Sequence, residues 1–415
     1  MKKHFVLAAK LLVVAALMWW VFQSIPFDDR LVYRDPATDK VVATEIILID
    51  GDWRQSPVPY RVGNDDTLRT ATRGEQPDGR TLDVEPGFLS YWRNLDPSWF
   101  ALAALCYCLT VMIAGARWWW LLRVNGTDVS LLETLRFTWI GIFFNTVMPG
   151  STGGDVIKAL YIMKRCPGHR VQVLVSVGVD RILGLGSLAL LGAVCVLFAL
   201  DRFAEIALSI WGVIVGVGLL GVFAFSRRLR SLIRLNDLLN RLPHKLRGML
   251  QMVDRAVFSY RNHRMVIAAS LLAGMLNHVI AVLCVVCIGK AIGVGMPVFE
   301  YFVLVPVINI LSALPIAPMG WGIGEAAYGI LFGTHGAAYL GGGPAAAAAM
   351  HTRGVAVSVL YRLMLTAISL LGGLFLLFEK DKVTQADIDR EVALEEKEGE
   401  GELPEDGVEP DKPAD

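Results

Sequence analysis

The chain has 415 residues, of which 54% are hydrophobic and 19% charged, and its mean hydropathy is +0.50. These values exclude an ordinary soluble domain and predict an integral membrane protein. The net charge of zero combines a basic segment, 227–264, with ten basic and two acidic residues, and an acidic end, 379–415, with fifteen acidic and five basic residues. We expect the basic segment to lie on anionic lipid and the acidic end to be solvated.

Six apolar runs are long enough to cross a hydrocarbon core of about 30 Å. They cover residues 5–22, 99–122, 171–200, 204–225, 266–292 and 345–378. The first run begins like a signal peptide, but no small-x-small cleavage site follows it and Trp19 and Trp20 stand near its end. We therefore expect residues 1–23 to be a retained transmembrane anchor.

Residues 24–97 form a separate extracytoplasmic insertion. The segment LVYRDPATDKVVATEIILIDGDW has β-branched runs on either side of a turn at residues 36–39, which predicts a hairpin or a small sheet. The predicted transmembrane domain covers 98–378 and includes the basic segment as an amphipathic cytoplasmic element. Residues 379–415 have the composition of a disordered tail.

Two further apolar stretches, 131–159 and 298–332, are each interrupted near the middle by Pro and Gly. Lys2 and Lys3 predict a cytoplasmic N-terminus. A single crossing over 131–161 would then place the basic residues at 164–170 outside, whereas a segment that enters and returns keeps them inside. We therefore predict two re-entrant helical hairpins that enter from opposite faces, a pattern typical of inverted-repeat transporters with a midplane site. Ordinary loops between full spans are the alternative.

The predicted fold class is an all-α polytopic membrane protein. It has about six transmembrane helices, two re-entrant helical hairpins and a small β-containing extracytoplasmic insertion. The same charge argument places the C-terminus, like the N-terminus, in the cytoplasm.

The tip of the first predicted hairpin is NTVMPGSTGGDVIKALY, residues 145–161. Its glycines do not have the spacing of a nucleotide-binding loop, and the flanking segments are helical. Pro149 would end one helix, and Thr152 with Asp155 would begin the next as a relaxed capping box. Free amide groups at that start would bind an anion such as a lipid phosphate, or would be satisfied by the capping side chain and water.

The second hairpin presents a similar motif, GWGIGEAAYG, in which Glu325 stands at a helix start. Two carboxylates near a phosphate require basic groups, and the candidates are Lys158, Arg181, Arg353 and Arg362. His351 and Arg362 are eleven residues apart, so they fall on nearly the same helix face. Charged groups inside a membrane indicate function by default, although static pairing of Asp180 or Glu325 with an arginine is the alternative.

The sequence contains no G-x-S-x-G or H-E-x-x-H motif, and its histidines are scattered rather than set beside the cysteines. We therefore expect no enzymatic activity, no cofactor and no metal site.

Four motifs, in order, resemble the lysylphosphatidylglycerol synthase transmembrane region family, a flippase-like domain. They are FFNTVMPGSTGGDVIKALYI, VSVGVDRILGL, PIAPMGWGIGEAAYGILF and VLYRL, and the resemblance covers roughly 99–378. In that family the membrane region is associated with translocation of aminoacylated or glycosylated lipids. The chain resembles a stand-alone member, because it contains no segment for the aminoacyltransferase or glycosyltransferase domain that some members carry. This departure removes the synthase activity that the family name suggests.

The resemblance and the residue patterns together predict lipid contact at fifteen positions. These are Asn145, Pro149, Gly150, Thr152, Gly153, Gly154, Asp155, Lys158, Asp180, Arg181, Gly322, Gly324, Glu325, His351 and Arg362. Asn145 is also a candidate for an interhelical hydrogen bond.

We expect a multi-pass protein of the bacterial inner membrane that moves an anionic phospholipid, an aminoacyl-lipid or a polyprenyl-phosphate-linked head group between leaflets. Its expected partners are membrane lipids and a lipid-synthesising or glycosyltransferase protein, but not nucleic acid. The alternative is a non-transporting scaffold that assembles envelope or lipid-modifying partners.

Overall fold

The computed structural model describes residues 27–36, 38, 40–63, 65–147, 153–166, 169–198, 200, 208, 211–212, 214–215, 260, 263–312 and 322–379. Within these ranges, four helices are long and apolar enough to cross a membrane: Pro97–Val124, Gln172–Leu197, Arg264–Ala291 and Gly343–Phe378. They correspond to four of the six predicted spans. The predicted span at 5–22 lies outside the described residues, as do most of the span at 204–225, most of the basic segment and the acidic tail beyond Glu379. Glu379 itself is buried and pairs with Arg136 at 2.5 Å, so the predicted solvated tail begins after it.

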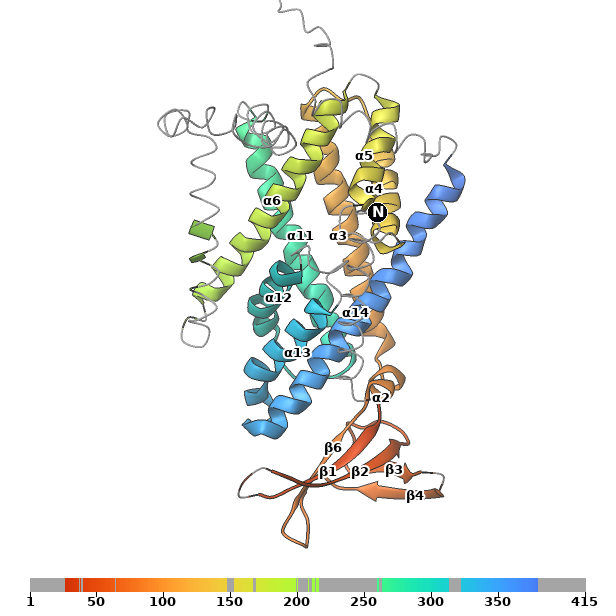
Figure 1. Cartoon of the computed structure of the whole chain (residues 1–415), viewed down its shortest axis with the longest axis vertical. Coiled ribbons are helices and arrows are strands. Elements are labelled where there is room, and N and C mark those ends of the chain that lie inside the picture. The colour runs from red at the N-terminus through yellow and green to blue at the C-terminus, as the bar shows by residue number, and fades with distance from the viewer. Residues whose placement is uncertain are drawn as a thin grey trace, which may run out of the picture.

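The described helices form two units with the same order, which is long, short, short, long (Figure 1). The first unit consists of α3 (Pro97–Val124), α4 (Leu131–Val147), α5 (Gly153–Arg165) and α6 (Arg170–Leu197). The second unit consists of α11 (Arg264–Ala291), α12 (Val298–Ser312), α13 (Ile323–Gly336) and α14 (Gly343–Phe378), with the 3-10 helix η3 (Ala337–Leu340) before α14. The short pairs α4–α5 and α12–α13 lie toward opposite ends of the helical bundle.

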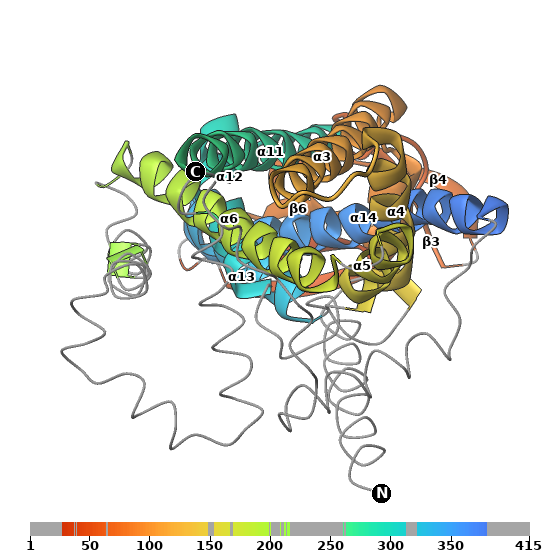
Figure 2. The same cartoon turned by 90° about the horizontal axis from the view of Figure 1, so that it is seen from above.

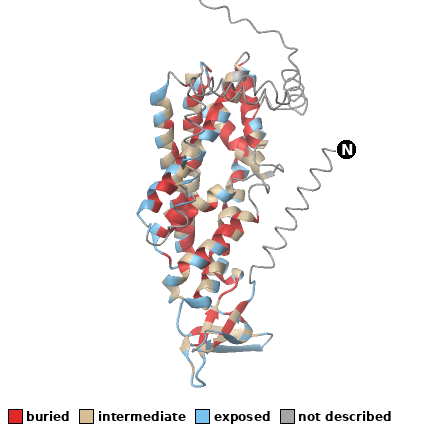
Figure 3. Cartoon of the chain, turned by 60° about the vertical axis from the view of Figure 1, so that its left-hand side comes forward, coloured by how far each residue is buried: buried red, intermediate tan, exposed pale blue. Residues whose placement is uncertain are grey.

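Contacts between the units follow a two-fold pattern. Helices α3 and α11 lie side by side (Figure 2), while α4 packs on α14 and α12 packs on α6. If the two units are exchanged, the contact of α4 with α14 becomes the contact of α12 with α6. The helices are therefore arranged as an approximate inverted repeat. Buried residues gather where the helices meet, and exposed residues face outward (Figure 3).

Glycines set the closest helix contacts, because they let two backbones approach. A side chain at Gly154 of α5 would overlap the carbonyl oxygen of Gly141 in α4. A side chain at Gly372 of α14 would overlap the carbonyl oxygen of Trp139 in α4, and one at Gly354 would overlap that of Tyr328 in α13. These glycines therefore hold α4 and α13 against α14, and α5 against α4.

The insertion folds as a six-stranded antiparallel sheet with strand order β4-β3-β2-β1-β6-β5. The strands are β1 (Asp29–Arg34), β2 (Val41–Ile49), β3 (Val58–Val62), β4 (Asp65–Ala71), β5 (Gly74–Glu75) and β6 (Thr81–Glu85). The predicted hairpin across 36–39 is confirmed, because β1 pairs with β2 and the Asp35 amide donates to the Lys40 carbonyl at 3.0 Å.

The sheet is joined to the helices by α2 (Phe88–Arg93) and by Asp29. The buried Asp29 carboxylate accepts hydrogen bonds from the amides of Ile49 (3.0 Å) and Gly87 (2.7 Å) and from the Ser90 hydroxyl (2.8 Å). Asp96 then caps α3 by accepting from the Ser98 amide at 2.8 Å. The sheet therefore sits at the end of the bundle where α3 begins and α11 ends.

Candidate functional site

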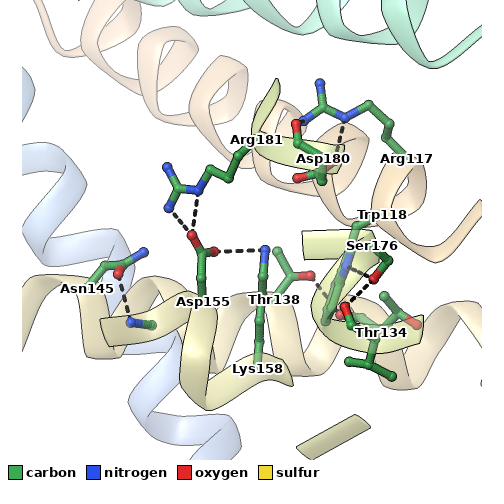
Figure 4. A network of polar contacts seen from close by, with 12 residues as sticks. Arg117, Trp118, Thr134, Thr138, Asn145, Asp155, Lys158, Ser176, Asp180 and Arg181 are labelled. Carbon is green, nitrogen blue, oxygen red and sulfur yellow. Dashed lines mark hydrogen bonds and ion pairs between the residues drawn. The ribbon is translucent and has the colours of Figure 1, made fainter. Parts of the chain in front are cut away.

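The start of α5 carries a polar cluster that draws on α4 and α6 (Figure 4). The Asn145 side-chain oxygen accepts from the Gly154 amide at 2.8 Å, so one free donor of the α5 N-terminus is satisfied by α4. Asp155 is the third residue of α5, where a carboxylate interacts favourably with the helix dipole. The sequence prediction of a helix start at this position is therefore confirmed.

Asp155 has two basic partners. Its Oδ1 lies 2.9 Å from Lys158 Nζ, and its Oδ2 accepts from the Arg181 guanidinium of α6. The Asp155 and Lys158 side chains are each 11% exposed, whereas the Arg181 side chain is 52% exposed. The Lys158 ammonium also lies 4.5 Å from the centroid of the Trp118 ring, a cation–π contact. The cluster thus has a buried centre and one accessible cation.

Asp180 precedes Arg181 in α6 but does not join this cluster. Its Oδ1 accepts from Arg117 Nε of α3 at 2.8 Å, and both residues are 8% exposed. Arg117 was not among the predicted site residues, because a basic residue near the cytoplasmic end of an apolar run is typical of the membrane surface. Arg117 lies five residues before Leu122, where the apolar run at 99–122 ends, and its neighbours in the sequence give no other signal. Asp180 is therefore paired with a buried arginine, which is the alternative of static pairing stated in the sequence analysis.

The second cluster lies at the start of α13, where Glu325 is the third residue. Glu325 is fully buried, and its Oε1 accepts from the Arg362 guanidinium of α14, whose side chain is 12% exposed. Its Oε2 accepts from the Gly322 amide at 2.6 Å. Gly322 has φ +83°, a conformation that favours glycine. The carboxylate therefore satisfies an amide group at this helix start, which is the capping alternative to a bound anion.

His351 and Arg362 both face α13, as their spacing predicted. A side chain at Gly329 would contact the His351 imidazole, and one at Gly324 would lie 2.5 Å from an Arg362 nitrogen. Arg353 lies elsewhere, because its Nη1 donates to the Val294 carbonyl at 2.8 Å, beside the sheet. The structure therefore brings Glu325, Gly322, Gly324 and Arg362 together and leaves Arg353 out.

Three predicted site residues, Pro149, Gly150 and Thr152, lie outside the described residues. Gly153 begins α5. Of the groups proposed for lipid contact, Asn145, Gly154, Asp155, Lys158 and Arg181 form one cluster. Within the described part of the chain, no three His, Cys, Asp or Glu residues are grouped in a way that could hold a metal ion.

Comparison with known proteins places this architecture in a family. Residues 83–378 match the lysylphosphatidylglycerol synthase transmembrane region, so the chain belongs to that family of membrane proteins. A UPF0104 membrane protein of Pyrococcus horikoshii is 33% identical over 120 residues, which is 28% of this chain and 36% of the relative. The aligned segment thus spans about a third of that relative's length. No solved structure matches the chain.

Proposed function

We propose that this protein binds the head group of an anionic phospholipid, aminoacyl-lipid or polyprenyl phosphate between the pairs α4–α5 and α12–α13. It moves that head group between leaflets without changing the lipid chemically. The observation that carries the proposal is the pair of buried acid–base clusters, Asp155–Lys158–Arg181 and Glu325–Arg362, at corresponding places in the two helical units. Ionisable groups inside a membrane are costly and mark substrate or ion pathways by default.

The depth of the clusters supports a midplane site. Arg181 is the tenth residue of the span Gln172–Leu197, which places it about 14 Å from the start of the span, near the middle of a core about 30 Å thick. The start of α5 pairs with this residue. With 17 and 13 residues, α4 and α5 are about 25 Å and 20 Å long, each too short to cross. A re-entrant α4–α5 hairpin satisfies all three observations, and α12–α13 is its counterpart from the other face.

The half-exposed Arg181 is the group that a lipid phosphate would contact first. A guanidinium at this depth is tolerated where it faces water or an anion, because exposure to hydrocarbon is costly. A lipid phosphate can therefore replace Asp155 as the partner of Arg181 and Lys158. The released carboxylate then accepts the amine of an aminoacyl-lipid or a proton, and the Glu325–Arg362 pair repeats this exchange on the other side.

The orientation follows from the positive-inside rule. The end of the bundle away from the sheet carries a set of basic residues near the helix ends. They are Arg123, Arg136, Lys164, Arg165, Arg170 and Arg264. We propose that this end is cytoplasmic, that the sheet is extracytoplasmic and that the protein is a multi-pass protein of the bacterial inner membrane. Labelling of a Lys164→Cys variant from the outer face of intact cells would contradict this orientation.

Reconstitution into liposomes tests transport. Fluorescent phosphatidylglycerol and fluorescent lysylphosphatidylglycerol are incorporated, and the fraction accessible to dithionite is followed with time. The proposal expects the wild type to expose inner-leaflet lipid, and it expects Glu325→Gln and Arg362→Ala each to abolish this exchange.

Two matched controls separate the clusters from general damage. Glu300→Gln changes another buried carboxylate, which accepts from the Tyr339 hydroxyl at 2.5 Å and belongs to neither cluster. Arg123→Ala removes an arginine whose side chain is 51% exposed. Both controls should retain exchange. Full exchange in Glu325→Gln and Arg362→Ala would refute the site assignment.

The sheet favours a second candidate function, that of a scaffold. Its strands expose several large apolar side chains, with Ile46 60%, Leu48 47% and Leu68 57% exposed, and such surfaces mark protein contacts. If the protein is a scaffold for a lipid-synthesising or glycosyltransferase partner, the double variant Ile46→Ser, Leu48→Ser should abolish the cellular phenotype. The variants of Glu325 and Arg362 should then behave as the wild type. The reverse result favours transport.

A further inference from the structure

A cavity of about 450 Å³ lies where the sheet meets the helical bundle, apart from both clusters. Its walls come from the sheet and its following loop, from α2, from the loop after α11 and from the first turns of α14. Four arginines line it: Arg54, Arg73 and Arg353 lie beside Trp53, and Arg30 belongs to β1. Ala345, Ala346 and Ala349 form the α14 wall, and their small side chains leave the space open.

Three of these arginines, Arg54, Arg73 and Arg353, surround one indole. Their guanidinium carbons lie 5.6 Å (Arg54), 6.0 Å (Arg73) and 5.2 Å (Arg353) from the centroid of the Trp53 ring. Each cation–π contact contributes about 0.5–1 kcal/mol at an exposed site, and the contacts hold three like charges close together. Burial lowers the pKa of Arg73, Asp83 opposes this shift, and the charge of Arg353 adds to it. The cluster is therefore short of negative charge.

Main-chain oxygens position these arginines, and of the three only Arg73 has an ion-pair partner among the described residues, Asp83. Arg54 donates to the carbonyl oxygen of Ala291 at 3.0 Å, Arg73 to that of Trp53 at 2.6 Å and Arg353 to that of Val294 at 2.8 Å. Carbonyl oxygens carry no net charge. In the described chain, no carboxylate forms an ion pair with Arg54 or Arg353.

Three carboxylates also line the cavity, and two of them already have a cation. Glu85 accepts from Arg34 at 2.8 Å, and Asp83 lies 3.6 Å from Arg73. The third, Asp28, is exposed. Because Arg34 lies outside the cavity lining and neutralises Glu85, the surplus at the cavity is positive.

Two buried donors here have no acceptor. Trp53 is 5% exposed, and neither its Nε1 nor Arg353 Nε has a hydrogen-bond partner among the described residues. A buried donor without a partner costs about 1–3 kcal/mol, so such groups normally have an acceptor, and here a ligand that enters the cavity can supply it. The start of α14 lines the same cavity, and its dipole adds partial positive charge.

The cavity also lies at the depth of lipid head groups. α14 has 36 residues and is about 54 Å long, so it extends well beyond a core about 30 Å thick. Trp99, whose ring lies 4.4 Å from Lys290 Nζ, and Trp92, which is 50% exposed, stand at this end of the bundle. Tryptophan and lysine at such positions are typical of the membrane–water interface.

We propose that this cavity binds a phosphate group, presented by a lipid head group or by a soluble phosphate ester, between Arg54, Arg73 and Arg353. The phosphate oxygens supply both the missing negative charge and the missing acceptors. Guanidinium groups match this geometry, because their paired N–H groups bind phosphate oxygens two at a time. The inference goes beyond transport, since binding here is measured without any lipid exchange.

The test uses the full chain purified in dodecyl maltoside without phosphate, titrated in a calorimeter. One arm uses dihexanoyl phosphatidylglycerol and the other uses glycerol 3-phosphate. We expect saturable binding of at least one probe and a roughly ten- to hundredfold weaker Kd in Arg353→Gln and Arg73→Gln, the loss expected for one charged hydrogen bond. Binding of the lipid probe alone identifies a head group as the source, and equal or exclusive binding of glycerol 3-phosphate identifies a soluble ester.

A second pair of variants keeps the test independent of folding, because the arginines also hold main-chain contacts. Ala349→Glu places a carboxylate in the cavity wall, and it should abolish binding without lowering the melting temperature below that of Ala348→Glu. Ala348 is the preceding, exposed residue of α14 and does not line the cavity, so its variant should bind as the wild type. Absence of binding in both arms, wild-type binding by Ala349→Glu, or a lower melting temperature of Ala349→Glu than of Ala348→Glu would overturn the proposal.

Discussion

The starts of α5 and α13 use the same elements in different ways. Each places an acidic residue third in a short helix, directly after a glycine, and pairs it with an arginine of the following long helix. Glu325 is sealed, with no exposed surface and with its own helix amide as a second partner. Asp155 is open, because Arg181 is half-exposed. One repeated motif therefore gives one closed and one accessible charge cluster, as expected if a site is reached from one side at a time.

The largest effect should come from breaking the sealed cluster. Arg362→Ala leaves the fully buried Glu325 without a cation, which should lower the free energy of unfolding by about 3–5 kcal/mol. The measurement is an unfolding titration in detergent followed by tryptophan fluorescence. Adding Glu325→Gln to Arg362→Met removes both charges and should recover most of the loss, because a neutral pair carries no such penalty. A single variant as stable as the wild type would mean that Glu325 is solvated.

An effect of intermediate size on stability should distinguish Gly154 from Gly324, the glycines that directly precede the two acidic residues. Gly154→Ala places a methyl group onto the main chain of Gly141, which cannot move without separating α4 and α5, so we expect a loss of about 1–3 kcal/mol. Gly324→Ala meets the end of the Arg362 side chain, which can shift, and should cost less.

Gly178→Ala in α6 is the matched control, since among the described residues no atom beyond its own stretch of helix lies within 4 Å of the added carbon. It should be neutral or stabilising by about 0.5–1 kcal/mol, because alanine favours a helix over glycine. The three variants are compared by thermal melting, and equal losses for Gly154→Ala and Gly324→Ala would contradict the difference between the two helix starts.

The smallest effect on stability should come from the open cluster. Arg181→Ala removes a half-exposed partner while Lys158 remains 2.9 Å from Asp155, so the cost should be about 0–1 kcal/mol. The same variant should nevertheless lose lipid exchange in the liposome assay. A large loss of stability with exchange retained would show that Arg181 is a structural group, as Arg117 is with Asp180.

Much of the fold was predictable, because apolar length and glycine placement act locally. The four long spans, the β1–β2 hairpin and the helix start at Asp155 follow from such signals. The partner of each charged residue could not be predicted in this way, since a long side chain can reach several helices. Arg117 turned toward Asp180, and Arg353 turned toward the sheet rather than toward Glu325.

By itself, the sequence determined which segments are long and apolar enough to enter a membrane and that charged residues within them need a partner, because burial of apolar length and the cost of charge depend on composition. Packing of the two helical units decided the rest. It set which cluster is sealed and which is accessible, and it assembled the arginine-lined cavity from residues as far apart as Trp53 and Arg353. Such contacts depend on which helix faces meet, and no local pattern along the chain specifies them.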